Sequence, residues 1–158
     1  MGDTKRRRKK FNRPRKLYDK VRIEAENVLV EKYGLKNKRE IWKAKTKISD
    51  VRRRAKNLIP KEEEEKKDFF RRLSSDGYKV SSISDVLALN EEDLLNRRLQ
   101  TFVSLKKLAN TPKQARQLIV HKHVMVGGKI VNIPSFHVSI KNENEISLKE
   151  KAQEKDGN

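Results

Sequence analysis

Residues 94–141 are 48 consecutive residues that contain nine Lys or Arg side chains and no Asp or Glu. A solvated protein surface usually mixes both signs of charge. This acid-free stretch therefore predicts a surface that lies against a polyanion, and nucleic acid is the first candidate. Chance clustering in a basic protein is the alternative. The stretch also holds signals for a helix and for a hairpin, which predicts a small α+β module.

The helix signal in this stretch is the pair Thr111-Pro112. Thr is a good N-cap, Pro suits the first helical position, and Gln114 completes a capping box. We expect the helix to end near His121. Its predicted buried residues are Ala115, Leu118 and Ile119.

The hairpin signal is Gly127-Gly128, which separates the short apolar runs 124–126 and 129–131. Gly-Gly suits the two-residue primed turns that join antiparallel strands. We expect a further strand from about Phe136 to Ile140, and a short one near Ile146, to complete a small sheet.

A single long helix is predicted at the start of this module. Asn90 would cap it, and the three acidic residues 91–93 would face the positive end of the helix dipole. The buried stripe is expected to contain Leu95, Leu99, Phe102, Val103 and Leu108. The basic residues expected to stay outside are Arg97, Arg98, Lys106 and Lys107.

Three more helices are predicted upstream, followed by a Ser-rich connector over residues 78–90. The first runs from about Asp19 to Tyr33 and stops at Gly34. Its apolar residues at helical spacing are Val21, Ala25, Val28, Leu29 and Tyr33. The third begins at the acidic run 62–65, holds Phe69, Phe70 and Leu73, and closes at the turn 75–77.

The second helix is expected to start at Asn37, with Glu40 as the return half of a capping box, and to end at Pro60. Its apolar stripe contains Ile41, Ala44, Ile48, Val51, Ala55 and Leu58. Its basic face contains Lys43, Lys45, Lys47, Arg52, Arg53, Arg54 and Lys56. Trp42, Phe69 and Phe70 offer rings for stacking on bases, but core packing is the expectation for all three.

The N-terminus is a different kind of segment, because nine of the twelve residues from Lys5 to Lys16 are Lys or Arg. Like charges at this density repel one another, so residues 1–18 are expected to be a disordered basic arm without RNA. The arm would track phosphates, and a localisation signal is the alternative. Residues 149–158 are expected to be a flexible tail.

Several classes of protein do not fit this sequence. It contains no Cys, which excludes disulfide scaffolds, cysteine zinc sites and cysteine nucleophiles. No apolar run approaches the roughly 20 residues that span a bilayer, and no predicted helix has the face of a cationic membrane-surface protein. No phosphate loop, catalytic triad or metal cluster is visible, so we expect neither an enzyme nor a cofactor. His121 and His123 could hold a metal, but the only other histidine is His137.

Three blocks of this sequence resemble one known family. The run Thr111-Pro112-Lys113-Gln114-Ala115-Arg116-Gln117-Leu118-Ile119, followed by the hairpin 124–132, resembles the RNA-binding module named after protein four of the small ribosomal subunit. Residues 96–101 and 131–136 resemble the archaeal and eukaryotic type of that ribosomal protein. So does Tyr33-Gly34-Leu35-Lys36-Asn37-Lys38-Arg39-Glu40. The resemblance covers most of residues 1–148.

The resemblance implies an α+β protein with four parts: a basic arm over 1–18, a helical domain and connector over 19–90, the RNA-binding module over 91–148, and a tail over 149–158. The module would present a helix N-terminus and fixed cations to RNA phosphates. The candidate RNA-binding residues in the module are Arg97, Arg98, Lys106, Lys107, Thr111, Lys113, Gln114, Arg116, Gln117, His121, Lys122, His123 and Lys129. Those in the arm and the helical domain are Lys5, Arg6, Arg7, Arg8, Lys9, Lys10, Lys43, Lys47, Arg52, Arg53 and Arg54.

The resemblance also implies a function without catalysis. The protein would be a structural constituent of the small ribosomal subunit in the cytoplasm. It would be a primary binder of small-subunit (16S-type) rRNA that nucleates assembly of the subunit body and supports translational accuracy. Its other partners would be small-subunit ribosomal protein five, further neighbouring ribosomal proteins, and mRNA near its entrance, with no membrane. The alternative is a free-standing RNA-binding factor that acts on ribosomes or on structured RNA.

Overall fold

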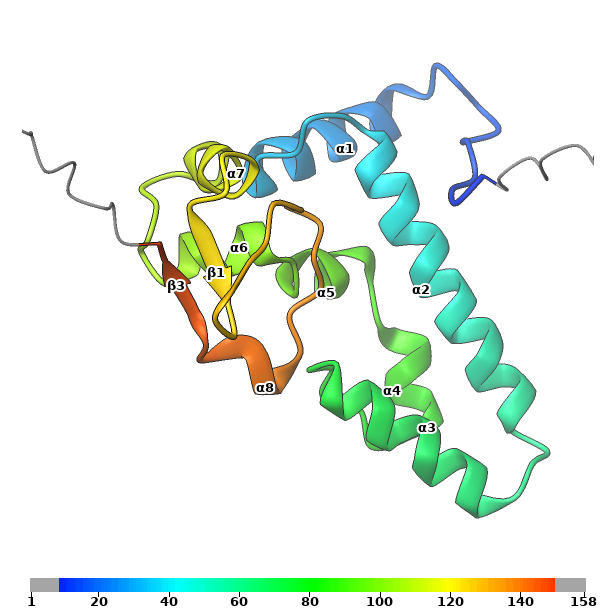
Figure 1. Ribbon diagram of the computed structural model, residues 1–158. Helices are drawn as coiled ribbons and strands as arrows, with labels where there is room; N and C mark the ends of the chain where they lie inside the picture. Colours follow the sequence, from blue (N-terminus) through cyan, green and yellow to red (C-terminus); the bar gives the residue numbers. More distant parts are fainter. Residues whose placement is uncertain (1–8, 150–158) are drawn as a thin grey trace, which may run out of the picture. The chain divides into compact units, whose positions relative to one another are not determined.

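The computed structural model describes residues 9–149, which form two compact units. The first unit is helical and extends to Leu95, apart from Ser75–Gly77. The second contains Ser75–Gly77 and the chain from Asn96 onward, and it combines short helices with a three-stranded antiparallel sheet. The predicted α+β class is therefore confirmed. We describe each unit by itself (Figure 1).

Helix α2 (Arg39–Leu58) is the longest helix of the helical unit. Its predicted stripe is confirmed, since Ile41, Ala44, Ile48 and Ala55 are buried. The predicted start at Asn37 is wrong by two residues. The Glu40 carboxylate accepts from the backbone N–H of Lys36 at 3.4 Å, so a side chain in the first turn of α2 holds the segment that precedes the helix.

Helix α1 (Lys20–Tyr33) ends at Gly34, as predicted, with that glycine in the left-handed region at φ 58°. The expected apolar stripe of α1 is confirmed at Tyr33, which is buried, and is wrong at Val21 and Val28, which are 77% and 63% exposed. The helix also buries the charged Glu26.

Glu26 is buried because three polar partners surround its carboxylate. Its Oε1 accepts from Arg22 Nη1 at 2.7 Å and from the Trp42 indole N–H at 3.0 Å. Lys38 Nζ lies 3.8 Å from Oε2. Since Trp42 belongs to α2, this carboxylate ties α1 to α2, and Trp42 is a packing residue as expected.

Glu92 makes a second polar tie to the C-terminal end of α1. Its carboxylate lies 2.5 Å from Lys32 Nζ and accepts from the Tyr33 hydroxyl at 3.1 Å. The Lys32 hydrogen bond lowers the pKa of Glu92 below its ordinary value, and the same bond raises the pKa of Lys32. Burial raises the pKa of Tyr33.

Helix α3 (Glu63–Ser75) carries Glu63, Glu64 and Glu65 in its first turn, as the acidic run predicted. The next segment corrects the sequence analysis, because the expected connector contains helix α4 (Ile83–Ala88). Ser82 caps α4 and accepts from the Asp85 N–H, while the Asp85 carboxylate accepts from the Ser82 N–H at 2.9 Å. The third helical position of this capping box holds Asp85, whereas the usual motif has Glu or Gln there, so the sequence pattern did not indicate the helix.

The long helix predicted after Asn90 is also wrong, because the chain breaks at Arg97 and Arg98. Helix α5 (Glu91–Asn96) ends there and α6 (Leu99–Leu105) starts there. The backbone at the break pairs with a distant segment: Leu99 N–H donates to Phe136 O at 2.8 Å, and Val138 N–H donates to Arg97 O at 2.9 Å. The strand expected from Phe136 to Ile140 is reduced to a single bridge between Arg98 and His137, and residues 140–143 form helix α8 (Ile140–Glu143).

The sheet of the α+β unit contains β1 (Val124–Val126), β2 (Lys129–Ile130) and β3 (Ile146–Leu148) in the order β2-β1-β3. The predicted hairpin is confirmed, with Gly127 and Gly128 both at positive φ. Helices α6 and α7 (Pro112–Val120) pack on this sheet through Leu99, Val103, Ile119, Val124 and Val138, which are fully buried. This packing fixes both ends of α7 relative to the sheet.

The described part of the basic arm packs against the helical unit. The Asn12 N–H donates to Thr46 Oγ1 at 3.2 Å, and the Phe11 ring lies 6.1 Å from the Trp42 ring. Arg22 donates to the carbonyl oxygens of Lys16 and Leu17. Residues 9–18 therefore have contacts within the protein that differ from the expectation of disorder. Residues 1–8 and 150–158 lie outside the described residues.

Candidate RNA-binding surface

The N-terminal end of α7 has the geometry of an anion-binding helix start. Thr111 Oγ1 accepts from the Gln114 N–H at 3.2 Å, and Pro112 occupies the first turn. Gln114 closes the turn differently from a standard capping box, because its Oε1 accepts from the Asn110 N–H at 2.9 Å. The exposed Lys113 adds a cation to the positive end of the helix dipole.

Arg116 on the same helix is half-buried and held by Gln100. Arg116 Nη1 donates to Gln100 Oε1 at 3.3 Å, and Gln100 Nε2 donates to Pro112 O at 2.9 Å. The Gln100 side chain is buried, so it fixes one edge of the guanidinium from inside the unit. The sequence predicted Arg116 as a site residue but gave no indication of Gln100.

The C-terminal end of α7 carries a second group of polar residues. His121, Lys122 and His123 are all exposed, with the two imidazole rings 6.5 Å apart. The Lys149 N–H donates to His123 O at 2.8 Å, because β3 runs beside β1 at this point. Lys149 is therefore a further basic residue near this end, which the sequence analysis had assigned to the tail. An apolar strand signal at 146–148 could have placed it.

The remaining predicted residues of the α+β unit divide into two classes. Lys106, Lys107, Gln117 and Lys129 are exposed. Arg97 and Arg98 are not outside, as had been expected, since the Arg97 side chain is 14% and Arg98 5% exposed.

Arg97 is engaged within the protein. Its guanidinium lies 3.2 Å from the Glu143 carboxylate, donates to Val138 O at 2.9 Å, and sits 4.9 Å from the Phe102 ring centroid. The ion-pair partner of Arg97 is thus Glu143, which lies 46 residues further along the chain. Burial leaves Arg98 no face for a phosphate in this conformation, so we retain neither residue as a direct RNA contact.

In the helical unit, the basic side chains of α2 flank its buried stripe. Lys43, Lys47 and Arg54 are exposed and, at spacings of four and seven residues, share one face about 16 Å long. Arg53 is exposed but lies 2.9 Å from Asp50. Arg52 is half-buried and donates to Leu89 O, which gives it a structural role. Lys9 and Lys10 are exposed at the start of the described chain.

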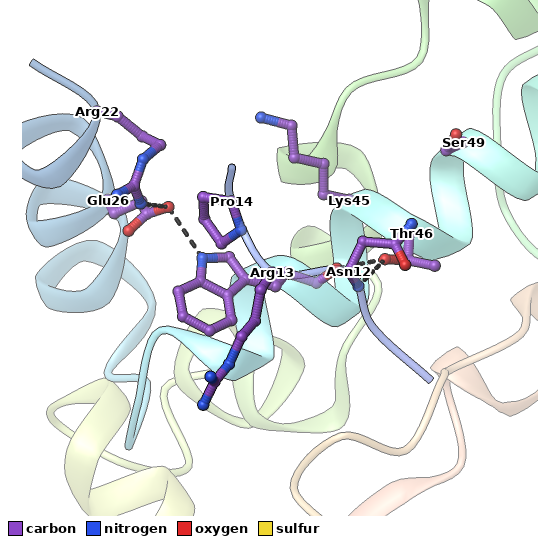
Figure 2. Close-up of a pocket in the computed structure, with 9 residues that line it drawn as sticks. Asn12, Arg13, Pro14, Arg22, Glu26, Lys45, Thr46 and Ser49 are labelled. Carbon is purple, nitrogen blue, oxygen red and sulfur yellow. Dashed lines mark hydrogen bonds and ion pairs between the residues drawn. The ribbon is translucent and has the colours of Figure 1, made fainter. Parts of the chain in front are cut away.

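A shallow pocket lies where the arm crosses α1 and α2 (Figure 2). Its lining includes Arg13 and Lys45, both exposed, beside the Arg22–Glu26 pair. The buried carboxylate is already neutralised by its partners, so the outer rim of the pocket is cationic. This rim adds Arg13 and Lys45 to the basic surface of the helical unit.

Two features that would point to other functions, a metal-binding cluster and a membrane-spanning helix, are absent from the part of the chain that the structure describes. Residues 9–149 contain no group of three or more His, Asp or Glu side chains placed to hold a metal ion. Among the same residues, no helix is long and apolar enough to cross a membrane.

Comparisons with known proteins match this chain to one domain family and to one family of ribosomal proteins. Residues 97–144 match the model of the S4 domain. The chain is 45% identical to the small ribosomal subunit protein uS4 of Methanococcus aeolicus, over 93% of this chain and 87% of that protein. It is 44% identical to the protein of the same name from Picrophilus torridus, over 95% and 87% of the two chains. It is also 44% identical to the small ribosomal subunit protein uS4 of Saccharolobus islandicus, over 91% of this chain and 83% of that protein. These relatives are named as ribosomal proteins and not as enzymes.

Proposed function

Because the chain belongs to the family of small ribosomal subunit protein uS4, we propose that it binds small-subunit rRNA directly and early, and that this binding nucleates assembly of the subunit body. Within this family the protein is a structural constituent of the small subunit with an RNA-binding S4 domain, and it is not an enzyme. The further proposal concerns how and when it binds.

The observation that carries the proposal is the exposed cationic surface around α7. Lys106, Lys107, Lys113, Lys122 and Lys129 are exposed in a stretch without Asp or Glu. Folded RNA presents phosphates and 2′-hydroxyls more readily than base edges, so cations and polar donors on a rigid scaffold suit its recognition.

The basic face of α2 supports a second contact. Lys43, Lys47 and Arg54 would follow a separate stretch of RNA backbone, because they belong to the other unit of the chain. Two basic surfaces on one chain would bind different RNA helices and hold them together, which is the action required of a protein that nucleates assembly. The first residues of the arm would thread between these helices.

The remaining partners are part of the same proposal. The protein would contact small-subunit ribosomal protein five, lie near the mRNA entrance and support decoding accuracy in cytoplasmic ribosomes. We assign no residue to the protein contact.

Crosslinking of the tagged protein in cells, followed by sedimentation, tests the proposal. Crosslinks to small-subunit rRNA in both free small subunits and early precursor particles are expected. Crosslinks confined to mature particles would contradict early binding. Co-sedimentation with large subunits, or with free structured RNA alone, would support the alternative of a free-standing RNA-binding factor.

A further inference from the structure

Two lysines of the α+β unit have a backbone conformation that L side chains rarely adopt. Lys107 has φ 56° and Lys122 has φ 63°, and among residues 9–149 every other residue at positive φ is a glycine. The left-handed conformation brings Cβ close to the following carbonyl oxygen, so a lysine there bears a penalty that glycine avoids.

Both lysines occupy the same place in the same motif. Lys107 follows α6, where its N–H donates to Ser104 O and the Leu108 N–H donates to Val103 O at 3.1 Å. Lys122 follows α7, where its N–H donates to Ile119 O and the His123 N–H donates to Leu118 O at 3.0 Å. This double bonding is the Schellman end of a helix, whose left-handed residue is usually Gly.

The helical unit of the same chain follows the usual rule. Helix α1 ends in Gly34 at φ 58°, and the Leu35 N–H donates to Val30 O at 3.0 Å. The left-handed residue of this C-terminal motif is therefore a glycine in the helical unit and a lysine at both of its occurrences in the S4 domain. The two lysines share a property that glycine cannot supply, which is a cationic side chain.

No carboxylate of the described residues pairs with that charge. Both side chains are exposed, and within residues 9–149 neither lies in an ion pair with a carboxylate. A cation stabilises the negative end of a helix dipole. However, Lys106 already places a cation at the end of α6 at a negative φ, so this role does not require the left-handed position there.

We propose that Lys107 and Lys122 are a pair of phosphate-binding residues of the S4 domain, in which backbone strain is retained for the sake of two fixed cations. This inference rests on the proposed rRNA binding and assigns specific contacts to it. Each lysine lies in a turn that two backbone hydrogen bonds hold rigid. The Cα atom of each lysine is therefore already in place before RNA binds. Helix α7 lies between the two positions and is about 13 Å long, so the two lysines would contact different phosphates.

The test replaces each lysine by the residue that its backbone prefers. We expect Lys107→Gly and Lys122→Gly each to raise the Tm by about 2–4 °C, because strain is relieved. Each should also weaken binding to an in-vitro transcript of small-subunit rRNA. The slope of log K against log[salt] should become shallower by about 0.7–0.9 for each variant, and by about twice that for the double variant.

Three control variants separate the effect of losing the lysine charge from the effect of changing the backbone preference. Lys122→Arg keeps the charge, so its affinity and salt slope should match those of the wild type. Lys122→Asn tolerates positive φ without charge, so it should bind like the glycine variant. Lys67→Ala removes an exposed lysine from helix α3, which carries no candidate RNA-binding residue, and should leave the salt slope unchanged.

Glycine variants that bind rRNA with unchanged affinity and slope would overturn the inference while leaving the proposed function intact. Glycine variants that lower the Tm would also overturn it, because the lysines would then stabilise the fold. Failure of the wild-type protein to bind rRNA at all would instead refute the proposed function, and this inference with it.

Discussion

The Gln100 amide connects to Arg116 through a hydrogen bond of 3.3 Å, donated by the guanidinium to Gln100 Oε1. Gln100 is only 1% exposed, and its Nε2 donates in turn to Pro112 O in the first turn of α7. A buried amide thus sets the direction of an arginine on the candidate RNA-binding surface. Mutation of each partner separates the proposed RNA contact of Arg116 from the support that Gln100 gives to the fold.

Substitution of Arg116 by Ala tests the arginine itself. Loss of one charged contact to phosphate should weaken rRNA binding by about 1.5–3 kcal/mol, which is roughly 10- to 100-fold. The free energy of unfolding should change far less, because Arg116 is only half-buried. Filter binding and thermal unfolding on the same samples make the comparison. A lower Tm with unchanged affinity would assign Arg116 a structural role only.

Substitution of Gln100 by Leu tests the supporting amide. The change removes the Gln100 donor from the partly buried Pro112 O and should cost about 0.5–1.5 kcal/mol of stability. Affinity should also fall, but by less than in Arg116→Ala, because the cation is present and merely less well oriented. Equal or greater loss of affinity at temperatures where the variant is fully folded would show that Gln100 acts on RNA by another route.

The carboxylate of Glu26 should be the main polar support of the helical unit. Glu26→Ala leaves Arg22 and Lys38 without their partner and should destabilise by roughly 2–3 kcal/mol, somewhat below the figure for fully buried pairs. The matched control is Glu24→Ala on the same helix, whose exposed pair with Lys20 at 4.0 Å should contribute within about 0.5 kcal/mol. Denaturant unfolding measures the free energy of unfolding of both variants. Similar losses of stability in the two would show that Glu26 is not the main polar support of the helical unit.

Helix α4 should depend on the ionisation of Asp85. Donors from Ser81 and Ser82 lower the pKa of its carboxyl group from 3.8 to about 2. Because the folded pKa lies below the unfolded one, the stabilisation is complete above about pH 4 and is lost as the pH falls towards 2. Amide protection factors at residues 81–86, which correct for the intrinsic pH dependence of exchange, should therefore fall over this window.

The control for Asp85 is Asp85→Asn, which cannot ionise. The exchange rates of the two proteins should differ near pH 5 and converge near pH 2. A constant difference across that range would mean that ionisation of Asp85 does not stabilise the helix.

Gly77 should tolerate no side chain, because Arg97 occupies the space beside it. A Cβ at Gly77 would overlap the Arg97 guanidinium, and the backbone there has φ +89°. Gly77→Ala should cost about 1–3 kcal/mol from this overlap in addition to the backbone term. The control is Gly128→Ala at φ +73°, where nothing lies within 4 Å, so only the backbone term of roughly 1–2 kcal/mol applies. Equal thermal destabilisation of the two variants would show that Arg97 moves aside freely.

Local signals in the sequence predicted the elements whose ends are set locally. Gly34 and Thr111 act within their own turns, and the Gly127-Gly128 hairpin needs only adjacent residues, so these features were found. The helix break at Arg97 and Arg98 was missed because its cause lies about 40 residues away, where Phe136 and Val138 supply the pairing backbone. Periodicity cannot reveal a partner at that distance.

The same limit applies to the candidate surface. Spacing along α7 correctly placed Lys113 and Lys122 outside and Ala115 and Ile119 inside. Helical periodicity wrongly placed Arg97 outside, because its acidic partner Glu143 follows the acid-free stretch. It gave no indication of the buried Glu26, whose burial depends on Trp42 and Arg22. Charge alone does not show whether a cation faces solvent or closes a contact within the fold.

The salt dependence of rRNA binding tests the central claim most directly. If the two basic surfaces neutralise about six to ten phosphates, log K should fall against log[salt] with a slope of about −4 to −7. Titration of the full chain with a transcript of small-subunit rRNA at several salt concentrations measures this slope. A slope in that range supports two phosphate-facing surfaces, and an affinity that does not change with salt would contradict them.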